Sequence, residues 1–286
     1  MCFTLTKIKN IVALNRLKMC NFVRSTPQGK MTATDTHTHL YSKEFDEGRD
    51  SLIQNAIDGG VKRFFMPNVD SESIPGMFQV EKAFPEHCFA MMGLHPCSVN
   101  AKYQQELQVV EYWLNKRKFV AIGEIGIDLY WDKTFFEQQQ DAFRRQIGLA
   151  KKYNIPYVIH SRSSFDEVME IVSEFKNDQI KAIFHCFSGN IAQAEQVIAA
   201  GDFKLGIGGV VTFKNSGLDK VVEAIDLKHL VLETDAPYLA PMPHRGKTNL
   251  PEYLMVVAKK VAELKKVSVE EVVAVTTKNS VEVFGC

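Results

Sequence analysis

The 286-residue sequence lacks the features that would draw a protein to a long polyanion or into a membrane. Lysine plus arginine and aspartate plus glutamate each total 34, so the chain has no overall basic field. No apolar run reaches the roughly 18 residues of a membrane-spanning helix, and no secretory signal pattern opens the chain. Any recognition of phosphate must therefore be local.

Paired cysteines and nucleotide-binding glycine motifs are also missing. The six cysteines form no Cys-x-x-Cys pair, which argues against a finger-type zinc site and for reduced thiols in the cytoplasm. "HRGKTN" ends like a P-loop, but Pro241 stands where the first glycine is required. "LGIGGVV" has Val211 in place of the last glycine of a dinucleotide fingerprint, so its glycines predict close packing in a strand. No G-x-S-x-G motif supports a serine triad.

From Asp35 onward, short apolar runs alternate with segments of helical periodicity. Eight strands with helices between them, in about 250 residues, predict an α/β protein of the (β/α)8 TIM-like barrel class, and a doubly wound open sheet is the alternative. We expect one barrel domain over residues 34–286. The eight runs begin at Asp35, Val61, Cys88, Lys118, Ile155, Ile180, Phe203 and His229.

Residues 1–33 are expected to be an N-terminal extension outside the barrel. This segment contains basic side chains and no acidic ones. A transit peptide and a start assigned upstream of Met31 are the two explanations of that composition.

Side chains that can bind metals lie where the predicted strands end. In "DTHTHL", His37 and His39 would share one face of an extended strand. A lone histidine at a strand end is usually a polar cap, but the carboxyl ends of all barrel strands open onto one face. We therefore expect a metal centre there. The remaining members of the set are His95, Glu124, His160, His185 and Asp235.

These side chains outnumber the ligands of one zinc ion with an open position, so two divalent ions are expected. A carboxylate can bridge two ions that lie roughly 3.5 to 4 Å apart, and Glu124, midway round the barrel, is the natural bridge. Nitrogen and oxygen donors suit zinc, manganese or iron, and magnesium where waters supply most ligands.

The segments that carry these residues resemble the TatD family of metal-dependent deoxyribonucleases, within the amidohydrolase-type barrels. The motifs "DTHTHL", "GLHP", "GEIGID", "IHSR", "HCFSG", "GIGG" and "ETDAPYL" occur in order from about Asp35 to Phe284. The resemblance implies a TIM-like barrel, two divalent ions such as Mg, Mn or Zn, and hydrolysis of DNA phosphodiesters. It also implies that the metal ligands are His37, His39, Glu124, His160, His185 and Asp235.

The implied function is that of a 3′-5′ exodeoxyribonuclease on single-stranded DNA, with a metal-bound hydroxide as the nucleophile. Glu124 as the bridge and Asp235 as the acceptor of the water's proton are the expected catalytic residues. Two positions depart from the family pattern, because Ser163 and Leu250 stand where acidic residues are usual. Both bear on substrate preference rather than on the ligand set. The expected substrate-binding residues are His95, Arg162, Arg245 and Asn249, with a salt bridge in the loop layer as the alternative for the two arginines.

Two other functions are compatible with the pattern. The first is a metal-dependent amidohydrolase for an amide, lactone or ester, although many such enzymes carry a carboxylated lysine on strand 4 where this chain has Glu124. The second is a catalytically idle barrel that binds nucleic acid or protein. The complete ligand set argues against that second function.

Overall fold

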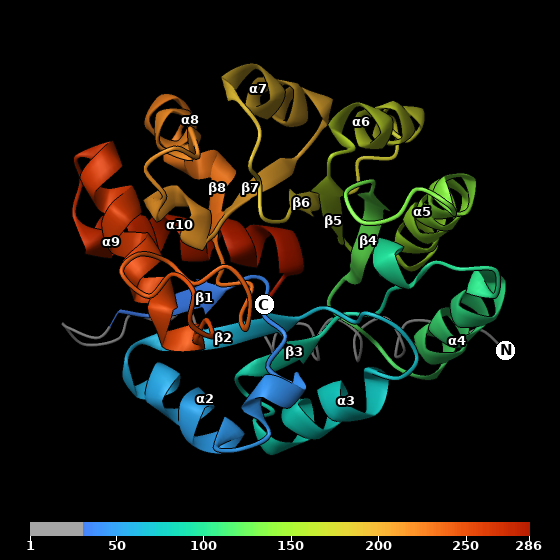
Figure 1. Ribbon diagram of the computed structural model, residues 1–286, viewed down its shortest axis with the longest axis horizontal. Coiled ribbons are helices and arrows are strands. Elements are labelled where there is room, and N and C mark those ends of the chain that lie inside the picture. Colours follow the sequence, from blue (N-terminus) through green and yellow to red (C-terminus); the bar gives the residue numbers. More distant parts are fainter. Residues whose placement is uncertain (1–30) are drawn as a thin grey trace, which may run out of the picture.

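Residues 31–286 form an α/β barrel in the computed structural model (Figure 1). The part of the predicted extension up to residue 30 lies outside the described residues. β1 begins at Ala33, one residue before the predicted start of the domain, and Met31 packs against the core. The strands are β1 (Ala33–Asp35), β2 (Val61–Met66), β3 (Cys88–Ala90), β4 (Ile122–Asp128), β5 (Tyr157–Arg162), β6 (Ala182–Phe184), β7 (Phe203–Ile207) and β8 (Leu230–Leu232).

Most helices lie on the outside of this ring, and the last helix runs across one end of it (Figure 1). The helices are α2 (Arg49–Asp58), α3 (Ile74–Ala83), α4 (Tyr103–Lys116), α5 (Phe136–Tyr153), α6 (Phe165–Glu174), α7 (Ile191–Ala200), α8 (Leu218–Ala224), α9 (Leu254–Lys265) and α10 (Val269–Phe284). Short 3-10 helices are η1 (Lys43–Phe45), η2 (Pro96–Ser98), η3 (Gly209–Thr212), η4 (Leu227–His229) and η5 (Pro251–Tyr253). Within residues 31–286, no helix is long and apolar enough to cross a membrane.

All paired strands are parallel, and hydrogen bonds continue round the whole ring. Strands β1 to β3 pair in one group and β4 to β8 in another. Beyond β3, the amide of Met92 donates to the Ala121 carbonyl and the amide of Gly123 donates to the Met92 carbonyl, each over 3.1 Å. The amide of Thr36 donates to the Leu232 carbonyl over 3.0 Å, which joins β8 to β1. The predicted TIM-like barrel is confirmed, and the open sheet is excluded.

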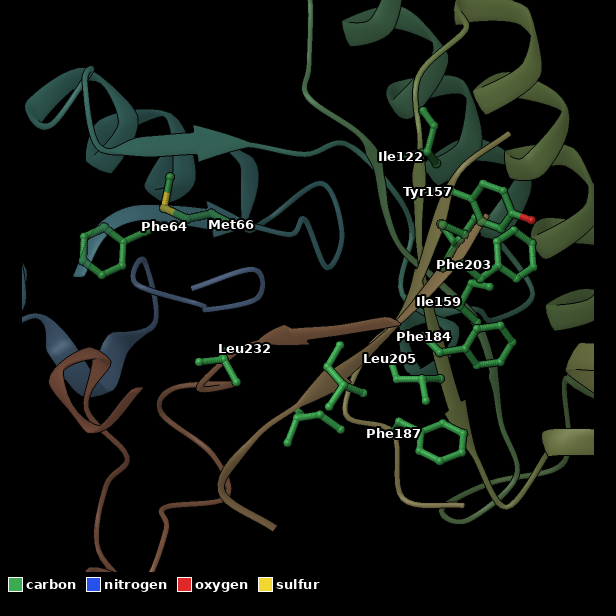
Figure 2. Close-up of a cluster of buried hydrophobic side chains, with 14 of the residues drawn as sticks. Phe64, Met66, Ile122, Tyr157, Ile159, Phe184, Phe187, Phe203, Leu205 and Leu232 are labelled. Atoms are coloured by element: carbon green, nitrogen blue, oxygen red, sulfur yellow. The ribbon is translucent and has the colours of Figure 1, made fainter. Parts of the chain in front are cut away.

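Alternate side chains on each strand face opposite ways and form two buried layers. Tyr157 and Ile159 of β5 pack outward into the large core beneath the helices, whereas Val158 between them belongs to a separate inner cluster. Figure 2 shows Tyr157, Phe184 and Phe203 gathered on the outer side of β5, β6 and β7. Burial on both faces explains why these strands read as continuous apolar runs.

The inner apolar cluster and the polar site lie on the same face of the strands, since alternate residues of a strand point to the same side. Val158 and Ile183 lie in the inner cluster with Phe284, the last residue of α10. Two residues beyond the first two, His160 and His185 have the same parity and point to the inside nearer the carboxyl ends of the strands. An apolar layer therefore fills one end of the barrel, and polar side chains fill the other.

Three predicted placements are corrected by the structure. β1 ends at Asp35, so His37 and His39 lie in the loop beyond the strand rather than on one of its faces. Glu124 is the third residue of β4 and His160 is the fourth of β5, so both project from inside strands and not from their ends. Just beyond the end of β1, the Asp35 side chain accepts the amide of His37 over 3.3 Å, a local bond that competes with strand pairing.

Candidate metal centre

The predicted ligands converge at the carboxyl end of the barrel. Their ligand-capable atoms form overlapping groups of three in which all atoms lie within 4.8 Å of one another. Such packing of imidazoles and carboxylates in a mostly buried site is typical of a metal centre. The groups contain the whole predicted set, His37, His39, Glu124, His160, His185 and Asp235, together with His95 and Cys186.

Glu124 lies at the middle of this arrangement, and its two oxygens face different histidines. Oε2 is 3.0 Å from His37 Nε2 and 3.8 Å from His39 Nε2. Oε1 is 2.7 Å from His160 Nδ1 and 3.5 Å from His185 Nε2. One side chain can thus present one oxygen to each of two cation positions, as the bridging assignment requires.

Asp235 occupies the opposite side of the same site. Its Oδ1 lies 3.5 Å from His39 Nε2, 3.8 Å from His37 Nε2 and 3.9 Å from His185 Nε2. Its amide donates to the His37 carbonyl over 2.9 Å, which ties the loop after β8 to the loop after β1. The residue has a φ of 56°, a left-handed conformation that aspartate tolerates better than most residues.

A chain of hydrogen bonds sets the tautomer of His39. The Tyr41 hydroxyl donates to the Pro67 carbonyl over 2.6 Å. That hydroxyl lies 2.9 Å from His39 Nδ1, and since its proton is already used, Nδ1 must be the donor. His39 Nε2 therefore carries a lone pair, and this atom faces Asp235 and Glu124.

His160 has a carboxylate at each ring nitrogen. Nε2 lies 2.9 Å from Asp128 Oδ2, and Nδ1 lies 2.7 Å from Glu124 Oε1. Burial works to lower the pKa of His160, but the two carboxylates outweigh it and raise that pKa, so the ring can donate to both as an imidazolium. A metal ion at Nδ1 would take the place of the second proton. The outer contact with Asp128 matches the carboxylate–histidine pairing found behind metal ligands, which leaves Nδ1 as the ligand atom.

His185 also has a carboxylate near its outer nitrogen, although within residues 31–286 this contact is not a hydrogen bond of good geometry. Nδ1 lies 3.1 Å from Glu233 Oε1, and Nε2 faces Glu124 and Asp235. Gly206 of β7 makes room for this contact, because a Cβ there would lie 2.2 Å from Glu233 Oε2. The close packing predicted from "LGIGGVV" is thus explained by a carboxylate placed behind a histidine.

His37 supplies the test of whether the site fits a metal. The side chain is fully buried, and within residues 31–286 neither ring nitrogen makes a hydrogen bond of good geometry. A buried polar atom left without a partner is costly, so such an atom calls for a ligand. Since Nε2 is also 3.0 Å from a Glu124 oxygen, a divalent cation shared by these two residues satisfies both.

His95 differs from the other histidines in its tautomer. Its Nδ1 accepts the amide of Cys97 over 3.0 Å, so in the neutral ring Nε2 carries the proton. That Nε2 lies 3.5 Å from Glu124 Oε1, at the edge of the centre. A nitrogen that bears a proton can donate to a substrate oxygen but cannot bind a metal, which separates His95 from the four histidines predicted as ligands.

The same contacts shift the proton affinities of the site. Burial works to raise the pKa of Glu124, but the surrounding histidines, His37 first, hold it well below its usual range. Burial works to lower the pKa of His185, but Glu233 and Glu124 outweigh it and raise the pKa to about 10. The carboxylate is held ionised while positive charge is favoured beside it, as a bound cation requires.

Arg162 and Arg245 lie at the rim without the salt bridges that were their alternative interpretation. Throughout the described chain, no carboxylate lies within salt-bridge distance of either guanidinium. Each group instead lies over an aromatic ring, Arg162 at 3.9 Å from the Tyr130 centroid and Arg245 at 4.6 Å from that of Phe213. Their N–H groups are therefore available to an anion.

Asn249, a predicted substrate-binding residue, is bonded to the loop that carries Asp235. Its side chain is fully buried, and its amide donates to the Thr234 and Tyr238 carbonyls over 2.6 Å each. These bonds hold the loop that carries Asp235 in place. The Oδ1 of Asn249 is buried without a hydrogen-bond partner within residues 31–286, and substrate binding by Asn249 stays a prediction.

Three acidic residues of the site were missed at the sequence level. Asp128 and Glu233 orient His160 and His185, and Asp35 accepts the hydroxyl and the amide of Thr234 over 2.6 and 2.9 Å. All three lie inside motifs that had drawn attention only to their neighbours. The signal that could have found them is an acid next to, or two to four residues from, a proposed ligand.

The family description "TatD related DNase" matches residues 34–285. The chain belongs to the TatD-related DNase family. YabD of Bacillus subtilis strain 168, an uncharacterized metal-dependent hydrolase, is 36% identical over 251 residues, which cover 87% of this chain and 98% of YabD. YjjV of Escherichia coli K12, also an uncharacterized metal-dependent hydrolase, is 30% identical, with 88% of this chain and 97% of YjjV covered.

Solved structures agree with this assignment. The crystal structure of the TatD homologue YjjV from Escherichia coli K12 has a TM-score of 0.83 at 29% identity, covering 89% of this chain and 98% of that chain. A TatD-family hydrolase from Entamoeba histolytica has a TM-score of 0.75 at 20% identity, covering 90% of this chain and 99% of that chain, which shows the shared fold alone. This TatD-family chain is thus a metal-dependent hydrolase.

Proposed function

We propose that this hydrolase cleaves phosphodiester bonds of DNA with two divalent ions, as a 3′-5′ exonuclease on single strands. The observation that carries the proposal is the Glu124 carboxylate, with one oxygen beside His37 and the other beside His160. The contacts of His39 with Tyr41 and of His160 with Asp128 support it, because each occupies one ring nitrogen from outside and leaves the other nitrogen facing the site. The 3′ polarity rests on the resemblance of the motifs to the family.

The residues divide the chemistry among themselves. When bound, two divalent ions supply an activated water and neutralise charge on the phosphate. Glu124, His37, His39, His160, His185 and Asp235 would hold them. The Asp235 carboxylate, whose Oδ1 faces three imidazoles, would accept the proton that the attacking water loses. His95 Nε2–H donates to a phosphate oxygen at the edge of the centre.

The unpaired arginines favour an anionic substrate over a neutral one. Neighbours of similar fold include a protein called an uncharacterized amidohydrolase, with a TM-score of 0.76 at 19% identity, and an organophosphorus hydrolase, with a TM-score of 0.62 at 11%. The fold alone therefore does not choose between substrates. Two guanidinium groups at the rim without carboxylate partners can bind the non-bridging oxygens of a phosphodiester. A neutral amide or lactone has no anionic oxygens for them to bind.

The test is turnover of labelled DNA by metal-reconstituted protein. A 3′-labelled single strand should release labelled mononucleotide with Mg, Mn or Zn, and release should stop in excess EDTA and return when metal is restored. A 5′-labelled strand should instead shorten one nucleotide at a time, which reports polarity, and a matched RNA strand tests the sugar. Absence of DNA cleavage with every metal, together with hydrolysis of a lactone or amide panel, would refute the proposal.

A further inference from the structure

The loop between β4 and α5 presents two exposed aromatic side chains at the mouth of the barrel. Tyr130 is 56% exposed and Trp131 is 70% exposed, which makes Trp131 the most exposed large hydrophobic side chain within residues 31–286. Their rings meet edge to face, with centroids 4.8 Å apart and planes at 87°. The indole is therefore largely open to solvent and is in contact with a second aromatic ring.

This loop is fastened to the metal centre by a single carboxylate. Asp128 Oδ1 accepts the amides of Tyr130 and Trp131 over 2.9 and 3.4 Å. The other oxygen, Oδ2, lies 2.9 Å from His160 Nε2. Trp131 also lines a cavity of about 120 Å³ next to Asp128 and Cys97. The aromatic pair is thus one side chain away from a metal ligand.

Arg162 adds positive charge to the same place. It follows His160 by two residues on β5, and its guanidinium lies 3.9 Å from the Tyr130 centroid and 5.2 Å from the Trp131 centroid. An arginine without a carboxylate partner next to an exposed indole combines a phosphate donor with a stacking surface. Proteins bind single-stranded nucleic acid with this combination, because every base has a π-face.

We propose that Trp131 is a stacking platform for an unpaired nucleobase of the substrate strand, with Arg162 holding the adjacent phosphate. This inference rests on the proposed function and specifies how that site selects its substrate. In a duplex, the base faces are covered by neighbouring pairs, so an indole of this kind favours a single strand or a frayed end. Charge neutrality of the chain agrees, since long duplex binding needs many basic contacts.

The chain provides its own spectroscopic reporter for this contact. It has two tryptophans, and the other, Trp113, packs on α4 against Phe78 with centroids 4.9 Å apart. The substitution Trp113→Phe leaves Trp131 as the sole indole. Metal-loaded protein is titrated with a single strand that carries phosphorothioate linkages throughout, so that it is not consumed. We expect quenching of Trp131 emission by this strand and no quenching by an abasic strand of equal length and charge.

The second test compares the Kd for the single strand among variants of the protein. Trp131→Ala should raise Kd for the single strand by about 5- to 150-fold, the range found when base-stacking aromatics are removed, and Trp131→Phe should recover part of it. Abasic sites in the strand should lower its affinity for the wild-type protein by a similar factor. Trp131→Ala and an abasic strand together should lower affinity no more than either change alone, because both remove the same contact. The matched control is Tyr112→Ala on α4, which removes an aromatic ring that is 54% exposed and also has a cation, Lys116, over it. That variant should bind like the wild-type protein.

The outcomes separate this inference from the proposed function. Cleavage of DNA by the wild-type protein without Trp131 quenching, or with unchanged affinity in Trp131→Ala, overturns the stacking platform alone. Quenching without cleavage under any metal overturns the nuclease and leaves the platform standing. Equal loss of affinity for base-bearing and abasic strands in Trp131→Ala shows that the indole contacts the backbone or supports the loop, and also overturns the stacking assignment.

Discussion

Replacing Asp128 by Asn tests the link between a ligand histidine and the carboxylate behind it. In the wild-type protein, one oxygen of Asp128 faces His160 Nε2 at 2.9 Å, and the other accepts the amide of Tyr130 at 2.9 Å. Asparagine has the same shape but only one acceptor oxygen. Its NH2 group must therefore face either the protonated Nε2 or the amide of Tyr130, and one buried hydrogen bond is lost.

The expected magnitude follows from that lost bond. An unsatisfied buried donor costs about 1 to 3 kcal/mol, which corresponds to roughly 5- to 150-fold in an equilibrium constant. Loss of a carboxylate behind a metal-binding histidine generally costs about 10- to 100-fold in metal affinity. The two estimates overlap, so we expect Asp128→Asn to weaken binding of the ion that His160 holds by about 10- to 100-fold.

The assay is calorimetric titration of metal into metal-free protein, with thermal unfolding measured to establish that the variant is folded. The matched control is Asp132→Asn, the same chemical change in the same loop, where the carboxylate is exposed and accepts from Thr134 rather than from a histidine. Asp132→Asn should bind metal like the wild-type protein. Equal metal affinity of Asp128→Asn and the wild-type protein would refute the assignment of His160 Nδ1 as a ligand oriented by Asp128.

Two further predictions concern the chain start and the rim. A chain that begins at Met31 should unfold at the same temperature as the full chain and retain its turnover, because Met31 packs on the core and the Thr32 carbonyl keeps the hydroxyl of Thr277 over 2.9 Å. A lower midpoint in a thermal melt would show that earlier residues stabilise the barrel. Arg245→Ala should lower kcat/KM for DNA by about tenfold to a hundredfold, since a charged hydrogen bond contributes about 1.5 to 3 kcal/mol. Arg245→Lys should recover part of the loss, and an unchanged rate in both variants would place the phosphate elsewhere.

Residue type and strand order were enough to predict the barrel and to gather the candidate ligands, because parallel strands bring their carboxyl ends to one face. The local backbone was not predictable in the same way. "DTHTHL" was interpreted as an extended strand, yet β1 ends at Asp35, whose carboxylate accepts the amide of His37. Side-chain to backbone bonds of this kind compete with a strand ladder and leave no periodic signal.

Burial and pairing were also beyond the sequence. Asn249 was expected to bind substrate because it matches the family's loop motif, and the sequence did not show that its amide is fully buried and bonded to the loop backbone. Asp128 and Glu233 were passed over because their role depends on which ring nitrogen they face. Such a contact joins residues 32 and 48 positions apart and can be assigned only in three dimensions.

The central claim is that Glu124 holds two cations together, and metal counting in Glu124→Gln tests it most directly. Glutamine keeps the volume but removes the negative charge that lets one side chain bind at both cation positions. The affinity for both ions should therefore fall together. We expect two divalent ions per wild-type chain, fewer than one per Glu124→Gln chain, and a loss of several orders of magnitude in kcat/KM for single-stranded DNA. Two ions per Glu124→Gln chain together with near wild-type turnover would contradict the account.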